Sequence, residues 1–154
     1  MDERLTALNA LLGVRDWRAA DAETRRLLVD DIDEGGYLGI DPDEASHLDC
    51  DLIVDIDKAW LHASTGRFAF STQLRILGDV MAMDLPANDT WRSFGRQVGW
   101  VDGREWIEER GVRYTEDAPP GHLPYVPGMG TVVTTGRIYE GFMNFYARVG
   151  ACFD

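Results

Sequence analysis

The sequence predicts an all-α protein, a single domain of six to seven short helices with at most one minor hairpin. Its 154 residues, 45% of them hydrophobic, suit one domain with a substantial buried core. Apolar residues recur at helical spacing in most segments, whereas a strand signal occurs at only one place. We therefore expect residues 1–154 to form one helical unit.

The first three helices are predicted from their apolar stripes and from the residues at their ends. Stripes at helical spacing cover residues 5–12 and 17–28, and Asp16 is expected to cap the second of these helices. A third helix is expected over residues 52–63, and Gly66 suits a left-handed C-cap after it.

Two further helices are expected before the hairpin. Ser71 is expected to cap a helix that reaches Met81. Asn88 or Asp89 starts the next helix, which stops at Gly99.

The strand signal is the dipeptide Asp102-Gly103, which favours a two-residue hairpin turn. In that register Val101 pairs with Arg104, and Trp100 pairs with Glu105.

Two segments lack helical periodicity and have an unusual composition. Residues 30–51 are rich in acids and turn residues, whereas residues 115–133 are rich in Pro and Gly and are expected to form a long ordered loop. The chain then closes on a helix with one apolar stripe, made of Ile138, Phe142, Phe145, Tyr146 and Val149.

The charge of the chain argues against several classes of partner. A net charge of −12 at pH 7 disfavours nucleic acid and an anionic membrane surface, because binding to either needs clustered cations. The run Gly-Arg-Phe-Ala-Phe at residues 66–70 is similar to an aromatic RNA-binding strand, but its Gly and Arg stand in the wrong order. The sequence shows no integral membrane segment and no secretory or transit signal, so we expect a cytoplasmic protein.

Metal sites and disulfides also find little support in the sequence. Cys50 and Cys152 lie far apart and form no disulfide framework, so both are expected to be reduced and packed. His47 and Cys50 are one pair of possible zinc ligands without a second pair. A calcium-loop register that starts at Asp31 places Pro42 where a bidentate Glu is required.

Motifs for catalysis are missing as well. The sequence contains no nucleophile elbow, no phosphate-binding Gly-x-x-x-x-Gly-Lys-Ser/Thr loop and no His-x-x-x-His pair. We therefore expect that the protein is not an enzyme.

Five segments spread over nearly the whole chain are informative together. In order, they are LLGVRDWRAADAETRRLLV, DIDKAWLHASTGRFAFSTQLRI, FGRQVGW, DAPPGHLP and FYARVGAC. At this order and spacing they resemble the Genomes-Uncoupled-Four family, the porphyrin-binding accessory proteins of magnesium chelatase. The resemblance implies an all-helical fold shaped like a cupped hand, in which the ligand lies on an apolar palm between two loop fingers.

The resemblance also implies where the ligand binds. The first finger corresponds to about residues 31–48, and the second finger to about residues 121–135. Several apolar residues inside these loops are expected to close over the ligand, the alternative being that they only fix the loops to the body. They are Tyr37, Leu38, Ile40, Leu123, Tyr125, Val126 and Met129.

Aromatic and basic residues elsewhere complete the implied site. Phe68 and Phe70 are expected to share a face that is either the palm floor or the core beneath it. Arg67, Arg113 and Arg137 flank the loops or the palm, where each can meet a propionate or act as a structural arginine.

The resemblance implies non-enzymatic binding of protoporphyrin IX or Mg-protoporphyrin IX by a monomer, with no covalent cofactor. A magnesium chelatase subunit is the implied partner. The alternative is a regulatory or protein-interaction domain of the same fold that binds a bilin, haem or no pigment. The chain is expected to lack the extra N-terminal helical bundle of larger members, and Tyr37 stands where a tryptophan is expected.

His122 lies in a tight Pro/Gly turn at the start of the second finger. An imidazole in such a turn is expected to hydrogen-bond the backbone rather than serve as an axial ligand of a metalloporphyrin. We therefore expect no metal ligand among the site residues.

Overall fold

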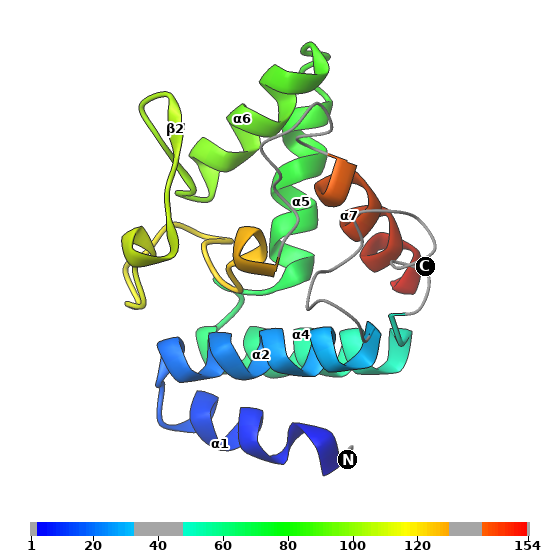
Figure 1. Cartoon of the computed structure of the whole chain (residues 1–154), viewed down its shortest axis with the longest axis vertical. Helices are drawn as coiled ribbons and strands as arrows, with labels where there is room; N and C mark the ends of the chain where they lie inside the picture. The colour runs from blue at the N-terminus through cyan, green and yellow to red at the C-terminus, as the bar shows by residue number, and fades with distance from the viewer. Residues whose placement is uncertain (1–2, 33–47, 130–139, 154) are drawn as a thin grey trace.

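The computed structural model describes residues 3–32, 48–129 and 140–153 (Figure 1). Within these ranges the chain forms six α-helices, one two-stranded antiparallel sheet and three short 3-10 helices. The α-helices are α1 (Thr6–Gly13), α2 (Trp17–Ile32), α4 (Cys50–Ser64), α5 (Phe70–Met81), α6 (Ala87–Gln97) and α7 (Glu140–Cys152). The remaining elements are η1 (Glu3–Leu5), β1 (Val101–Asp102), β2 (Glu105–Trp106), η2 (Glu109–Gly111) and η3 (Val126–Met129). The expected all-α class with one minor hairpin is confirmed.

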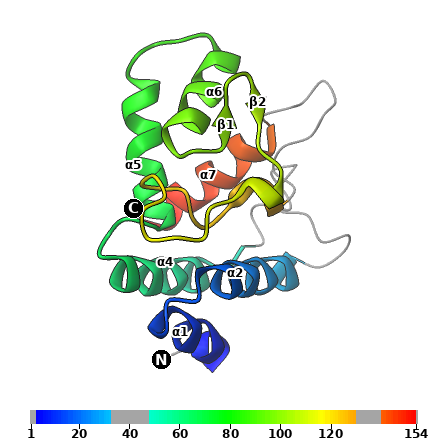
Figure 2. The same cartoon turned by 90° about the vertical axis from the view of Figure 1, so that its left-hand side faces the viewer.

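Helices α2 and α4 form a central layer, with α1 on one side and α5, α6, α7 and the hairpin on the other (Figures 1 and 2). Helix α1 contacts both α2 and α4, whereas α5 contacts α6 and α7. The central layer is joined to the second side by contacts between α4 and α7. None of the helices in the ranges described combines the length and the hydropathy that a membrane span requires.

Two tryptophans hold α2 and α4 together. Trp17 stacks on Trp60 with ring centroids 6.0 Å apart. The buried Nε1–H of Trp60 donates a hydrogen bond of 2.9 Å to Thr24 Oγ1, and that hydroxyl donates to Ala20 O. A buried indole N–H needs such an acceptor, so Thr24 allows the large Trp60 ring to be fully enclosed.

A second, mainly aromatic core lies between α6, α7 and the hairpin. Phe142 of α7 stacks on Trp91 of α6 at 5.2 Å and on Trp100 at 6.2 Å. All described members of the predicted α7 stripe are buried, which confirms the helical spacing: Phe142, Phe145, Tyr146 and Val149. Ile138, the first residue of that stripe, lies outside the described residues.

Two expected helix ends are confirmed. The backbone N–H of Ala19 donates to Asp16 Oδ1, so Asp16 caps the start of α2. Helix α4 ends in a left-handed turn, in which both Thr65 and Gly66 have positive φ.

The predicted Ser71 cap is wrong. Helix α5 begins at Phe70, and Ala69 in the N-cap position makes no side-chain bond. The free N–H of Ser71 instead donates to Asp57 Oδ1 of α4 at 2.8 Å. A tertiary partner thus replaces the local cap, and burial raises the pKa of the Asp57 carboxyl.

The predicted hairpin register is also wrong. Val101 pairs with Trp106 and Asp102 with Glu105, so Gly103 rather than Asp102 begins the two-residue turn, with φ at +64°. Val101 and Trp106 pack directly over Gly95 of α6, where an added Cβ would lie 2.6 Å from a Val101 methyl. Packing of these two side chains on α6 favours this register over the one in which Val101 pairs with Arg104.

Candidate ligand-binding site

The predicted site falls partly inside and partly outside the described residues. Tyr37, Leu38 and Ile40 of the first finger and Arg137 lie outside them, and so does the side chain of Met129. The segments that anchor both fingers are described, and they show how the loops are attached to the helical body.

The predicted ligand residues near the start of the second finger are buried. Leu123 and Val126 are fully buried, and only 5% of Tyr125 is exposed. The Tyr125 hydroxyl donates to Ile107 O at 2.9 Å, and its ring makes an edge contact with Trp100. These side chains fix residues 123–126 to the body, and they offer a ligand almost no free surface in this arrangement.

Gln73 of α5 is the central support of the same segment. Its Nε2 donates to Gly121 O at 3.0 Å and to Pro124 O at 2.8 Å. Its Oε1 accepts a hydrogen bond from the hydroxyl of Tyr146 in α7. One fully buried amide therefore ties the loop to two helices.

His122 has both ring nitrogens engaged. Nδ1–H donates to Val98 O at 2.7 Å, and Nε2 accepts the backbone N–H of Arg113 at 2.9 Å. Its own carbonyl accepts the Trp100 indole N–H. Burial lowers the pKa of the His122 imidazole, which favours the neutral form that this pattern requires. The predicted backbone-bonding role of His122 is confirmed.

Of the three predicted arginines, Arg67 serves as an anchor and Arg113 is exposed. The Nε of Arg67 donates to Ala118 O at 2.7 Å, and its carbonyl accepts the N–H of Gly121. Arg67 thus holds the Pro-rich loop, whereas the guanidinium of Arg113 faces solvent.

Phe68 and Phe70 are both buried, but they pack in different parts of the core. Phe68 makes an edge contact with Trp17 of α2 at 5.6 Å. Phe70 makes one with Phe145 of α7 at 5.4 Å. Both rings therefore pack between helices in this arrangement, Phe68 against α2 and Phe70 against α7.

Asp21 of α2 is the one strongly perturbed carboxyl beside the second finger among the described residues. Its Oδ1 accepts the backbone N–H of Tyr125 at 2.8 Å, and only 2% of the residue is exposed. Burial raises the pKa of Asp21 to about 6, against the lowering effects of the Tyr125 hydrogen bond and of Arg25. Asp21 is thus an anchor for the loop, with a charge that is costly to bury.

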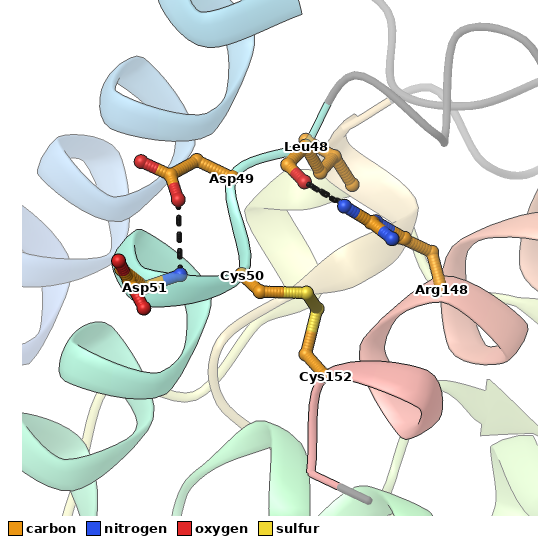
Figure 3. The surroundings of a disulfide bond; sticks show 6 residues. All are labelled: Leu48, Asp49, Cys50, Asp51, Arg148 and Cys152. Atoms are coloured by element: carbon orange, nitrogen blue, oxygen red, sulfur yellow. Dashed lines mark hydrogen bonds between the residues drawn. A yellow bond between two sulfur atoms is a disulfide. The ribbon is translucent and has the colours of Figure 1, made fainter.

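The end of the first finger is anchored by a different set of contacts (Figure 3). Leu48 O accepts hydrogen bonds from Nε and Nη2 of Arg148 in α7, at 3.2 and 2.7 Å. Two residues further on, Cys50 forms a disulfide with Cys152. The expectation that both cysteines are reduced is wrong, because the fold brings the start of α4 against the end of α7 although 102 positions separate them. We call Leu48, Cys50, Arg148 and Cys152 the α4–α7 junction.

These anchors place the ends of both fingers on neighbouring elements. The first finger lies between α2 and α4, whereas the second includes η3 and is followed by α7. Helix α2 contacts η3, and α4 contacts α7. Both fingers are therefore attached to helices of one body, although α7 begins at Glu140, at the opposite end of that helix from the disulfide at Cys152.

Sequence reasoning missed five anchoring residues. Gln73 and Asp21 are polar residues that fall on the buried stripes of α5 and α2. A polar residue at a buried position needs a partner, so the sequence could have indicated their anchoring role. Arg148 and the cysteine pair gave no such signal, because their partners are about a hundred residues away.

The fold and these anchors define a mostly α-helical, single-domain protein. The part of the chain that the structure describes contains no cluster of His, Cys, Asp or Glu suited to a metal ion. The chain belongs to the GUN4-like family, whose model matches residues 1–140. This confirms the family resemblance, and membership suggests a tetrapyrrole-binding, regulatory role.

Solved structures show the same fold. GUN4 from Chlamydomonas reinhardtii aligns with a TM-score of 0.68 and 21% identity, over 100% of this chain and 91% of that one. The ligand-free GUN4 of Arabidopsis thaliana aligns with a TM-score of 0.66 and 22% identity, over 97% of this chain and 92% of that one. No curated protein matches the sequence.

Proposed function

We propose that this protein binds a tetrapyrrole between its two fingers, with protoporphyrin IX or Mg-protoporphyrin IX as the ligand. In this role it assists or regulates magnesium chelatase and porphyrin trafficking as a cytoplasmic monomer, with residues 1–154 as one binding domain and without catalysis of its own. The observation that supports this proposal is a pair of contacts, α2 with η3 and α4 with α7. Both predicted fingers are thereby attached to the same body, in a chain that belongs to the GUN4-like family.

Apolar contact supplies most of the affinity. A porphyrin is a flat apolar disc, and covering one face removes several hundred Å² from water, on the order of 10 kcal/mol before costs. Association and ordering of the loops take back much of this free energy, so a micromolar dissociation constant is expected.

The buried and the undescribed residues are proposed to have different roles in the site. Tyr37, Leu38, Ile40 and Met129 are proposed to contact the macrocycle. Leu123, Tyr125, Val126, Phe68 and Phe70 are proposed to lie beneath it as a firm floor, because their side chains are buried. A ligand would contact these rings and methyl groups directly only if the loops moved.

The propionates need local cations in a chain with a net charge of −12. Arg113 is exposed and free to turn toward a carboxylate, whereas Arg67 is already bonded to Ala118 O. We assign propionate contact first to Arg113 and Arg137, and to Arg67 only through the remaining N–H groups of its guanidinium.

The engagement of His122 supports an open centre of the macrocycle. Both ring nitrogens already bond backbone groups, so an axial bond to a metal would cost one of these hydrogen bonds. A porphyrin with an accessible centre suits exchange with a chelatase.

The proposal is tested by titrating the protein with deuteroporphyrin while tryptophan fluorescence is recorded. We expect saturable quenching, and binding at least tenfold weaker for Leu38→Asp, since a buried leucine contributes about 2 kcal/mol. Val14→Asp is the matched control, because Val14 is 76% exposed in the turn between α1 and α2 and belongs to neither finger.

Two results would contradict the proposal. Unchanged affinity in a folded Leu38→Asp variant would remove the first finger from the site. Absence of quenching in the parent would favour a regulatory domain that binds a bilin, haem or no pigment, and the same titration with those pigments separates these cases.

A further inference from the structure

The disulfide lies at the surface rather than in the core. A groove of about 530 Å³ runs past it, and both cysteines are half-buried. Its lining consists of Arg4, Asp49, Cys50, Asp51, Val54, Asp55, Lys58 and Cys152. A thiol in solution can therefore reach a bond that a core disulfide would hide.

The two sulfurs sit at opposite kinds of helix end. Cys50 is the first residue of α4, and Cys152 is the last residue of α7 (Figure 3). The partial positive charge of a helix N-terminus stabilises a thiolate, whereas a C-terminus disfavours one. The carboxylates of Asp49 and Asp51 beside Cys50 oppose this effect, so the helix ends alone do not decide which sulfur an incoming thiolate attacks.

Packing of α7 does not depend on the disulfide. Phe142, Phe145, Tyr146 and Val149 are buried along the first three turns. The last turn is different, since Ala151 is exposed and Phe153 is 39% exposed. Opening the bond therefore frees the end of α7 and the start of α4 without removing the core.

We propose that Cys50–Cys152 is a thiol–disulfide exchange site for a protein dithiol, and that its reduction loosens the end of the first finger. The dithiol's thiolate attacks one of the two sulfurs, which breaks the Cys50–Cys152 bond and releases the other cysteine as a thiolate. The second thiol of the dithiol then attacks the mixed disulfide and displaces the attacked cysteine as a thiolate. The protein gains two thiols, and the partner leaves oxidised as a disulfide.

The consequence for ligand binding rests on the proposed function. Cys50 is two residues from Leu48, where the first finger ends, and after reduction this end is held by Arg148 and by the buried side chain of Leu48. Reduction changes the order of this finger end, so it changes the affinity of a ligand that needs the finger. By thermodynamic reciprocity the ligand must shift the reduction equilibrium by the same factor.

The exchange step is tested with a thioredoxin-type dithiol whose resolving cysteine is replaced by serine. It is incubated with the oxidised native protein, and the mixed disulfide is mapped by mass spectrometry of non-reduced peptides. We expect the partner to be attached to Cys50 or Cys152 of the folded protein. Absence of a trapped complex would overturn the proposed site.

Loosening is tested by amide hydrogen exchange after reduction with the complete dithiol. We expect exchange at least tenfold faster for residues 49–52 and 148–153, and unchanged exchange at Leu77 and Val80 in the α5 core. The double variant C50S/C152S should match the reduced protein and should not respond to the dithiol. The inference fails if exchange is unaltered, or if reduction occurs only at urea concentrations that unfold the chain.

Deuteroporphyrin titration of the oxidised and reduced proteins completes the test. A severalfold difference in affinity supports the coupling, and equal affinities contradict it. If neither form binds a tetrapyrrole, the proposed function fails, while the trapping and exchange results still decide whether the site exists.

Discussion

The two fingers are anchored by different chemistry. Residues 118–126, at the start of the second finger, are held by several buried hydrogen bonds from Gln73, Asp21, Trp100 and Arg67. The α4–α7 junction, at the end of the first finger, is held by one disulfide, by the hydrogen bonds of Arg148 and by the buried side chain of Leu48. A network of many bonds holds a loop even when one bond is lost, whereas a covalent link can be opened by one reaction.

The largest loss of stability is expected for Gln73→Met, in the hydrogen-bond network of the second finger. Methionine fills a similar volume but leaves the carbonyls of Gly121 and Pro124 and the Tyr146 hydroxyl without their partner. Each unsatisfied buried group costs roughly 1–3 kcal/mol, so unfolding free energy should fall by about 4 kcal/mol. Urea unfolding followed by circular dichroism measures it.

The chain offers a matched control, because Gln97 is its only other glutamine and is exposed at the end of α6. Gln97→Met should change the unfolding free energy by no more than about 0.5 kcal/mol. A Gln73→Met variant as stable as the control would show that the network is not what holds the second finger.

A pH-dependent effect of intermediate size is expected at Asp21, which is the costly member of the network. Its pKa is about 6 in the folded protein and near the ordinary 3.8 when unfolded. The protonated form is therefore favoured by folding, and this contribution is fully present below pH 4. The contribution amounts to about 3 kcal/mol in total, and it is lost as the pH rises from 4 through 6.

Asp21→Asn should remove this loss and still accept the Tyr125 N–H. We expect the difference in unfolding free energy, variant minus parent, to rise from pH 4 to pH 6.5 and then stay level. Its size should be about 3 kcal/mol, the free energy that corresponds to the shift from 3.8 to about 6, which already includes the attraction of Arg25 for the carboxylate. Asp79→Asn, at an exposed position of α5, should give a flat difference. If the difference in unfolding free energy for Asp21→Asn does not change with pH, the Asp21 carboxylate is not destabilised by burial.

Local patterns allowed the helices to be predicted, because the information for them lies within a few residues. The α7 stripe and the Asp16 cap are examples, since each depends on spacings of three or four positions. Ser71 failed as a cap because Asp57, fourteen residues earlier, supplies the acceptor from another helix. The hairpin register failed because packing of Val101 and Trp106 on Gly95 outweighs the local turn preference.

The candidate site was harder to predict than the fold for the same reason. Apolar residues in a Pro/Gly-rich loop suggest ligand contact, but Leu123 and Val126 turn out to be buried. A buried loop residue and a ligand-facing one have the same side-chain chemistry, so only the tertiary arrangement distinguishes them. The disulfide was missed because no property of either cysteine reveals a partner 102 positions away.

The smallest effect is expected at the junction, for Arg148→Ala. The change removes two hydrogen bonds to Leu48 O, but the neighbouring disulfide keeps α4 and α7 together. Unfolding free energy should fall by only about 1 kcal/mol, and Arg75→Ala, at an exposed position of α5, should leave it unchanged. Hydrogen exchange at the first amides of α4 reports the same change locally.

Combining Arg148→Ala with C50S/C152S distinguishes the two anchors most clearly. If the disulfide and the arginine hold the same finger end, removing one should make the other more important for stability. The loss of unfolding free energy in the combined variant should then exceed the sum of the two separate losses by about 1 kcal/mol. The same cycle between Gln73→Met and C50S/C152S should be additive if the two anchors act independently. Additivity at the junction itself would mean that Arg148 and the disulfide stabilise α7 separately, and that reduction alone does not loosen the first finger.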